Sequence, residues 1–253
     1  MTLAAFQRAL CDMIRSPDAC LDLRAGAPGI LTRYDLSPRE RDRLLDIVWQ
    51  RGMSTNCTLY RSNRVTPIYT LLHYTCMVLG DRLKDTLDAY WAASDLHDLE
   101  FKHEIHRFSR FVREQIETST IVDPFVEEVL EFELAINDLR FAPRRDVLRG
   151  LQVQREAAER ASAPLQVHPL IRVIPFRHEP GELLRSLANR RVPRELPEIE
   201  SFLVLSRVEE DLSTRTLEPA LGRVLWRLQT DGAFSPSREI DDLVDSGLVV
   251  PTG

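Results

Sequence analysis

The sequence of 253 residues predicts an α+β protein, a helical bundle followed by a small sheet with helices. Two observations predict this class. Up to about residue 160, the chain has a helical pattern in which apolar residues recur every three or four positions, as they do on one face of a helix. After Pro164 the period changes towards two, which is typical of strands. The polar stretch 152–163 between the two parts is an exposed helix or a linker. We therefore expect two domains, residues 1–160 and 161–253.

The first helices are defined by their apolar faces and their ends. The first face contains Leu3, Phe6, Leu10 and Met13, and we expect Pro17 to end this helix. A second helix is predicted from Ser37-Pro38-Arg39-Glu40, where Ser37 and Glu40 have the spacing of a capping box and proline occupies the first turn. Gly52 is expected to end it.

Four further helical stretches follow in the first part. The expected ranges are Asn56–Leu79 with a break or restart at Pro67, Leu83–Trp91, Asp95–Glu117 and Pro124–Leu139. In the last of these, Phe125, Val129, Phe132 and Ile136 share the apolar face, so the opposite face is expected to carry Glu127, Glu128 and Glu131.

The second part alternates strands and helices. We expect one strand kinked at Pro169, a hairpin, two helices and a last strand. The expected ranges are Leu165–Ile174 for the kinked strand, Ser201–Val208 and Leu212–Leu217 for the hairpin, Pro219–Leu228 and 235–244 for the helices, and Leu248–Val250 for the strand. A small sheet followed by two helices resembles a winged helix.

The charge balance argues against a nucleic-acid partner. Lys84 and Lys102 are the two lysines among 33 basic residues, so arginine dominates, yet the net charge is −6. Residues 1–150 carry 20 basic and 23 acidic side chains, and residues 151–253 carry 13 and 16. Neither half has the basic excess that phosphate binding favours. The sequence shows no apolar run of about 18 residues, so we expect no membrane span and a cytoplasmic protein.

Motifs for common chemistry are scarce. The chain contains neither GxxxxGK[ST] nor GxGxxG, and its four cysteines include no CxxC pair and are expected to be small buried side chains. Histidines and acids gather at His97, Glu100, His103 and His106. Glu100 and His103 have the i, i+3 spacing of di-iron carboxylate bundles. A second ExxH is missing, so we expect a solvated polar face without metal, and a di-iron helical enzyme remains an alternative.

Two polar segments are candidates for recognition. The first segment is expected either to tie helices together or to face a partner protein, and its residues are Asn56, Tyr60, Arg61, Asn63 and Arg64. Arginine forks and tyrosine suit protein interfaces. The second segment is a solvated loop or a site for an acidic peptide, through bidentate contacts of Arg190, Arg191 and Arg194.

The strands offer a second way to hold a peptide. A small sheet can leave one edge open, where an extended peptide adds as a further strand. The sequence does not give the strand order. The residues that we expect to bind a peptide in this way are Phe202, Leu203, Val204, Leu205, Ser206, Arg207, Leu212, Thr214 and Thr216.

Several runs resemble one family. LYRSNR, LLHYTCMVLGDRLKDTLDAYW, the helix with Glu104, Arg107 and Phe111, and DPFVEEVLEFELAI are similar to the partner subunits of multinuclear non-haem iron oxygenases in peptide natural-product biosynthesis. Methanobactin-type and 3-thiaglutamate-type pathways are the known settings. The resemblance covers residues 30–140. The part from Leu165 onward resembles the precursor-recognition domains of peptide-modifying enzymes.

The resemblance implies a division of labour. A separate TIM-barrel enzyme holds the iron, and this chain, without a cofactor or catalytic residues of its own, binds that enzyme and docks the ribosomal precursor peptide. A cysteine of the peptide is then oxidatively modified, with excision of its β-carbon favoured over oxazolone and thioamide formation. The alternative from another class is a transcription regulator with a C-terminal winged helix.

Overall fold

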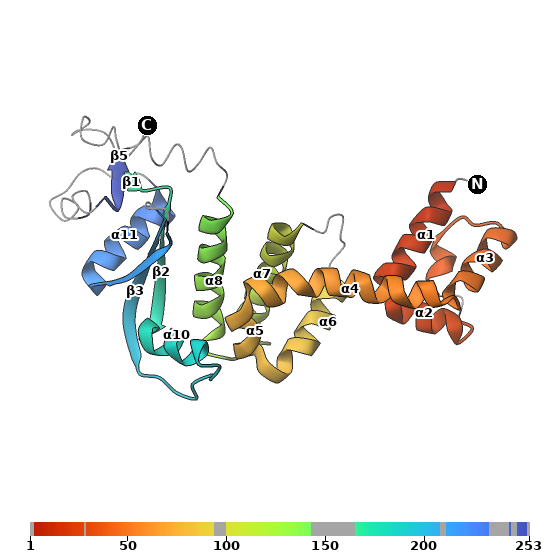
Figure 1. Ribbon diagram of the computed structural model, residues 1–253, viewed down its shortest axis with the longest axis horizontal. Helices are drawn as coiled ribbons and strands as arrows, with labels where there is room; N and C mark the ends of the chain where they lie inside the picture. The colour runs from red at the N-terminus through yellow and green to blue at the C-terminus, as the bar shows by residue number, and fades with distance from the viewer. Residues whose placement is uncertain are drawn as a thin grey trace. The chain divides into compact units, whose positions relative to one another are not determined.

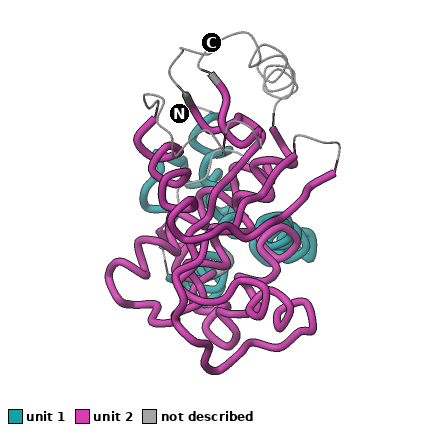
Figure 2. The backbone as a smooth tube through the Cα atoms, turned by 90° about the vertical axis from the view of Figure 1, so that its left-hand side faces the viewer, with its two compact units in different colours: residues 1–67 teal, residues 68–253 magenta. Residues whose placement is uncertain are grey.

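The computed structural model describes residues 3–27, 29–93, 100–142, 165–207, 211–232, 243 and 247–251 (Figure 1). It confirms the α+β class, with a helical region over residues 3–140 and small antiparallel sheets with helices from residue 166 to 250. The chain forms two compact units that divide after Pro67 (Figure 2). The boundary expected near residue 160, and the stretch 152–163, lie outside the described residues.

Unit 1, residues 1–67, is helical. Its elements are α1 (Leu3–Arg15), α2 (Pro17–Arg24), the 3-10 helix η1 (Gly29–Arg33), α3 (Pro38–Val48) and most of α4 (Arg51–Leu71). The first helix ends before Pro17, as expected, and Pro17 begins the next helix. It opens α2, because Ser16 caps that helix by accepting a hydrogen bond from the Ala19 amide at 3.4 Å and proline fits the first turn. Sequence analysis missed both α2 and η1.

The start of α3 has the expected capping box. The Glu40 amide donates to Ser37 Oγ at 3.2 Å, and the Ser37 amide donates to the Glu40 carboxylate at 2.9 Å. These bonds satisfy donors that a helix start otherwise leaves open. The bonds that the Ser37 amide and the Ser37 hydroxyl donate to the Glu40 carboxylate hold the pKa of Glu40 below its usual value.

Helix α4 differs from its prediction at both ends. It begins at Arg51, so Asn56, the expected first residue, lies inside the helix. The helix continues through Pro67 to Leu71, and the break comes at Leu72, whose φ of −122° and ψ of 46° leave the helical region. Proline removes one backbone donor, a loss that did not stop this helix.

Unit 2, residues 68–253, combines helices and sheets. Its helices are α5 (His73–Leu79), η2 (Gly80–Arg82), α6 (Leu83–Ala93), α7 (Phe101–Glu117), α8 (Val126–Arg140), α10 (Pro180–Ala188) and α11 (Pro219–Asp231). The predicted helices correspond well, whereas α10 was not expected. The predicted helix 235–244 falls mostly outside the described residues.

The strands of unit 2 form two antiparallel sheets. A pair joins β1 (Leu165–Val167) to β5 (Val249–Pro251), and a three-stranded sheet has the order β2 (Ile171–His178), β3 (Glu198–Ser206), β4 (Ser213–Leu217). The predicted hairpin is therefore confirmed as β3 and β4. The single kinked strand 165–174 is wrong, because β1 and β2 belong to different sheets. Between them the Ile171 amide donates to the His168 carbonyl at 2.9 Å, closing a turn around Pro169.

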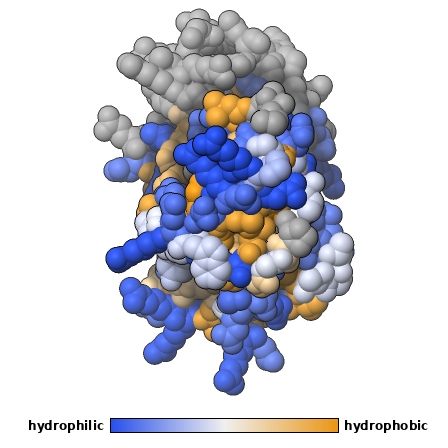
Figure 3. Space-filling view, turned by 90° about the vertical axis from the view of Figure 1, so that its right-hand side faces the viewer, coloured by the Kyte–Doolittle hydropathy of each residue, from blue (hydrophilic) through white to orange (hydrophobic). Residues whose placement is uncertain are grey.

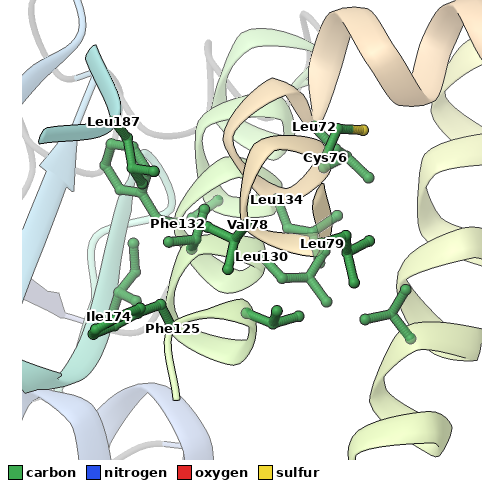
Figure 4. Close-up of a cluster of buried hydrophobic side chains, with 14 of the residues drawn as sticks. Leu72, Cys76, Val78, Leu79, Phe125, Leu130, Phe132, Leu134, Ile174 and Leu187 are labelled. Atoms are coloured by element: carbon green, nitrogen blue, oxygen red, sulfur yellow. The ribbon is translucent and has the colours of Figure 1, made fainter. Parts of the chain in front are cut away.

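Helix α8 is the centre of unit 2. Helices α5 and α7 and strand β2 all pack against it. Of the glutamates expected opposite its apolar face, Glu127 is exposed and Glu131 is half-buried, whereas Glu128 is only 4% exposed because β2 covers it. Figure 4 shows side chains of α5, α8, β2 and α10 in one core, including Leu79, Leu130 and Ile174. This shared core explains why the helices after residue 67 and the sheet form one unit.

The three-stranded sheet is covered on both faces. Ile174 and Phe176 of β2 point into the core with α8, while Val173 of β2 and Phe202 of β3 pack in a second core with Leu225 of α11. Helices α8 and α11 therefore lie on opposite faces of this sheet. Strand β2, at its edge, lies between them.

Candidate functional site

A groove of about 750 Å³ runs along β2 in unit 2. One wall is α8 with parts of α7, and the other is formed by Trp226 and Gln229 of α11. The floor consists of residues 172–177 of β2. Glu198, Glu200 and Phe202 extend the lining onto β3. A groove bounded by two helices and floored by a strand has the dimensions and walls to hold an extended chain.

The floor of the groove is a sheet edge. In the part of the chain that the structure describes, β2 pairs with β3 alone, so its other side faces the groove. On that side the Val173 amide donates to Gln229 Oε1 at 2.8 Å, and Gln229 Nε2 donates to the Val173 carbonyl at 3.0 Å. Pro175 has no amide hydrogen to offer. The Arg177 amide donates to the Glu128 carboxylate at 2.7 Å. The side chains of Gln229 and Glu128 thus form the hydrogen bonds with the main chain of β2 that a neighbouring strand would otherwise form.

The groove has an acidic balance. Among the described residues that line it, six carry carboxylates and three carry guanidiniums. Arg113 contacts Glu131 at 2.6 Å and His106 contacts Asp138 at 3.1 Å. Glu127 also contacts Arg177 at 3.4 Å, and Glu200 contacts Arg223, which lies outside the lining, at 2.5 Å. These contacts offset part of the negative charge, and the carboxylates that remain in excess over the guanidiniums favour a cationic occupant.

A buried acid and histidine join α8 to the end of β2. His178 Nδ1 lies 3.1 Å from Glu128 Oε1, and both side chains are almost fully buried. The ring of Phe125 packs edge-on against His178 at 4.9 Å. Burial raises the pKa of Glu128, and the bonds from Arg177 and His178 oppose that shift. This pair fixes the wall of the groove to its floor.

The expected peptide edge on β3 is wrong. Residues Phe202–Ser206 pair with β2 on one side and with β4 on the other, so no third strand can add. The side chains of residues 202–205 lie in the two cores. Arg207 donates to the Leu139 carbonyl at 2.5 Å and the Arg140 carbonyl at 3.1 Å, which caps the end of α8. Arg207 is therefore a structural residue.

The other expected peptide residues lie apart from the groove. Thr214 and Thr216 are exposed on β4, the opposite edge of the sheet, and Leu212 packs against the core. Arg190, Arg191 and Arg194 are exposed in the segment after α10, and none of them lines the groove. A peptide-binding role for Thr214, Thr216 and these arginines stays a prediction.

The expected partner segment is one side of α4. Asn56 and Asn63 are exposed, Tyr60 and Arg61 are half-buried, and Arg64 is 4% exposed with its guanidinium 5.9 Å from the Tyr60 ring. Burial places Arg64 in the packing of the helices, whereas a partner-binding role for Tyr60 and Arg61 stays a prediction. Asn56 and Asn63 remain available to a partner.

Sequence analysis missed one apolar residue beside this segment. Leu59 lies three residues after Asn56 and four before Asn63, hence on the same side of α4. On the face drawn in Figure 3, apolar side chains are open among polar ones. The large apolar side chains of unit 1 that are more than half exposed are Leu3, Leu21, Trp49 and Leu59.

The possible metal ligands do not converge in the described ranges, where no group of three or more acids, histidines and cysteines has the arrangement of a metal site. Glu100 contacts His103 at 3.5 Å on an exposed helix face. His97 lies outside the described residues. Glu133 accepts bonds from Tyr74 and Thr75. Of the four cysteines, Cys11 is exposed and Cys20, Cys57 and Cys76 are buried.

One signal in the sequence could have revealed the strand edge at the floor of the groove. A proline is tolerated in a sheet mainly on an edge strand. The run Ile171–His178 contains Pro175, so extending the predicted strand beyond Ile174 would have marked it as an edge. Gln229 carries no comparable signal, because its pairing with Val173 joins residues 56 positions apart.

Comparisons with known proteins provide no further guide. No protein-family model matches the chain, and no curated protein matches it significantly.

Within the described ranges, the helices lack the length and apolar content needed to cross a membrane.

Proposed function

We propose that this protein is a non-catalytic partner subunit that docks a peptide in the groove along β2. The observation that carries the proposal is a sheet edge enclosed between two helices. At such an edge, main-chain hydrogen bonds supply affinity and the side-chain pockets supply specificity. The groove combines both elements, whereas the exposed β4 edge has neither wall among the residues that the structure describes.

The resemblance noted above supports the identity of the complex. By that resemblance, the partner is a TIM-barrel multinuclear iron oxygenase, and the peptide is a ribosomal precursor whose cysteine undergoes oxidative modification. We favour β-carbon excision, as in 3-thiaglutamate-type pathways, over oxazolone and thioamide formation. The acids of α8 that a di-iron site would use have other contacts: Glu128 with His178, Glu131 with Arg113 and Glu133 with the start of α5.

The test is reconstitution with the iron oxygenase encoded beside this chain. The two proteins should co-purify, and turnover of the precursor should require both. If they neither associate nor depend on each other for turnover, the proposal fails. Metal analysis of this chain alone addresses the di-iron alternative: stoichiometric iron in the isolated protein would favour that alternative.

The exposed side of α4 gives a prediction for the oxygenase interface. We expect Leu59→Asp to reduce co-purification at least tenfold, because a charge at an apolar contact must be desolvated on binding. Leu3→Asp, another exposed leucine of unit 1, is the matched control and should have no effect. Equal loss in both variants, or none in Leu59→Asp, would contradict an interface on this side of α4.

A further inference from the structure

Gln229 occupies the position of a peptide group. A side-chain carboxamide has the same donor and acceptor as a peptide bond, and Gln229 uses both of them on Val173, at 2.8 and 3.0 Å. It projects from α11 and is half-buried in the lining of the groove. A strand that added to β2 would need those same two groups of Val173. The side chain and an incoming strand therefore compete for one position.

Further along β2, an added strand would also meet the Arg177 amide, which donates to the Glu128 carboxylate at 2.7 Å. To pair along the whole of β2, the strand would have to replace this bond as well as the two bonds of Gln229. Pro175 offers its carbonyl alone, so an added strand gains one bond there where other residues give two. Gln229 and Pro175 together also protect the free edge from unspecific pairing. Because Gln229 is a side chain on a single helix, its two bonds can be exchanged without disturbing the core contacts of α11.

The walls define which side chains the strand carries. Helix α8 runs antiparallel to β2, since Glu128 meets Arg177 at one end and Arg207 links Leu139 to Leu170 at the other. Glu127, Glu131 and Asp138 therefore follow one another along the groove. Four residues of helix rise about 6 Å, and alternate residues of a strand are about 6.6 Å apart. Alternate side chains of a bound strand would therefore match the spacing of Glu127 and Glu131, whereas Asp138 lies seven residues, about 10 Å, further along the helix.

We propose that the groove binds an extended peptide with basic side chains at alternate positions, and that its main chain replaces the Gln229 carboxamide on Val173. The inference rests on the proposed function and names the chemistry of the peptide segment that docks. It differs from the expectation of an acidic peptide at Arg190, Arg191 and Arg194, which lie outside the groove.

Three synthetic probes test the charge preference. Each is a fluorescein-labelled twelve-residue peptide with valine at every second position and Lys, Glu or Ser at the others. Fluorescence anisotropy with the full chain should show the Lys peptide binding at least tenfold more tightly than the Ser peptide, with affinity that falls as salt is raised. Equal or tighter binding of the Glu peptide, or no binding of any probe, would overturn the proposal.

Variants test the site itself. The double change Glu127→Gln and Glu131→Gln should weaken the Lys peptide about tenfold, whereas Glu114→Gln with Glu117→Gln, two exposed acids of α7, should leave it unchanged. Gln229→Ala and Gln229→Met, which fills similar space, should tighten binding of the Lys peptide about tenfold by removing the competitor, equivalent to about 1.4 kcal/mol. Gln50→Ala, which removes an exposed glutamine of unit 1, is the control and should leave binding of the Lys peptide unchanged.

Each result has one interpretation. Circular dichroism and the unfolding temperature first establish that every variant is folded. Unchanged or weaker binding in both folded Gln229 variants would exclude the exchange. If the oxygenase co-purifies and turns over while the probes do not bind, the proposed function stands and this inference fails. If the Lys peptide binds but no oxygenase associates, the groove is a peptide site and the proposed complex fails.

Discussion

At the scale of single residues, buried polar groups are the least expected feature of this chain. Glu133 of α8 is an example. It is 6% exposed and accepts bonds from the amides of Tyr74 and Thr75 and from the Thr75 hydroxyl. Burial raises its pKa to about 7 although these bonds oppose the shift. The pattern of apolar residues could not show this, because the partners lie 58 and 59 positions away.

Glu133 predicts a pH dependence of stability. Its pKa is higher in the folded than in the unfolded chain, so its contribution is complete below about 4.5 and is lost as the pH rises through about 7. The wild type should therefore lose on the order of 2 kcal/mol relative to Glu133→Gln between pH 5 and 8. Urea unfolding of both proteins at the two pH values measures this. For the exposed control Glu114→Gln, we expect the difference in unfolding free energy from the wild type not to change with pH. The same result for Glu133→Gln would contradict the prediction.

Gly222 predicts a loss of stability where helix propensity alone predicts a gain. A Cβ at this position of α11 would overlap the side chain of Phe202 on β3. Gly222→Ala should therefore destabilise the protein by about 1–3 kcal/mol. Gly52 in α4 has no neighbouring atom near a Cβ, so Gly52→Ala should be neutral or stabilising by up to about 1 kcal/mol. Chemical denaturation of both variants decides the matter, and a Gly222→Ala protein as stable as wild type would refute the close approach.

At the scale of elements, local signals predicted most helices and the hairpin, but not the strand order. Ser37 and Glu40 form their capping box within one turn, so four residues of sequence suffice to predict it. Strand β3 was expected to offer an open edge, but its run of apolar residues indicates a central strand. A strand buried on both faces and paired on both sides is central, which is the position that such runs favour.

The two edges of the sheet predict different results. Thr214 and Thr216 of β4 direct their main-chain groups away from β3, as the alternation of an antiparallel pair requires. Thr216→Pro removes one outward donor, a change that edge strands tolerate. We expect it to leave binding of the Lys peptide unchanged, measured by the same anisotropy titration. A tenfold loss would place the docking edge on β4 instead of β2.

At the scale of the whole molecule, the acidic charge separates two classes of function. A winged-helix regulator needs a basic surface, whereas this chain carries a net charge of −6 that is evenly divided between its two parts. The groove repeats this acidic balance locally.

The charge predicts the outcome of a mobility-shift assay. About 10 µM protein should not retard duplex DNA of about 30 base pairs at 0.15 M salt, where even non-specific binders have dissociation constants of about 100 to 1 µM. A retarded band that disappears as salt is raised would support the regulator instead. A strongly basic DNA-binding domain serves as the positive control.

The sequence by itself determined the α+β class, the positions of most helices, the capping box and the hairpin. These features depend on periodicity and on hydrogen bonds between residues a few positions apart. The tertiary structure alone decided the division after Pro67, the edge position of β2, the burial of Glu128 and Glu133, and the pairing of Gln229 with Val173. Each of these depends on contacts between residues far apart in the chain, for which the local pattern contains no signal. The candidate site belongs to this second group, because a groove exists only once α8, β2 and α11 are assembled.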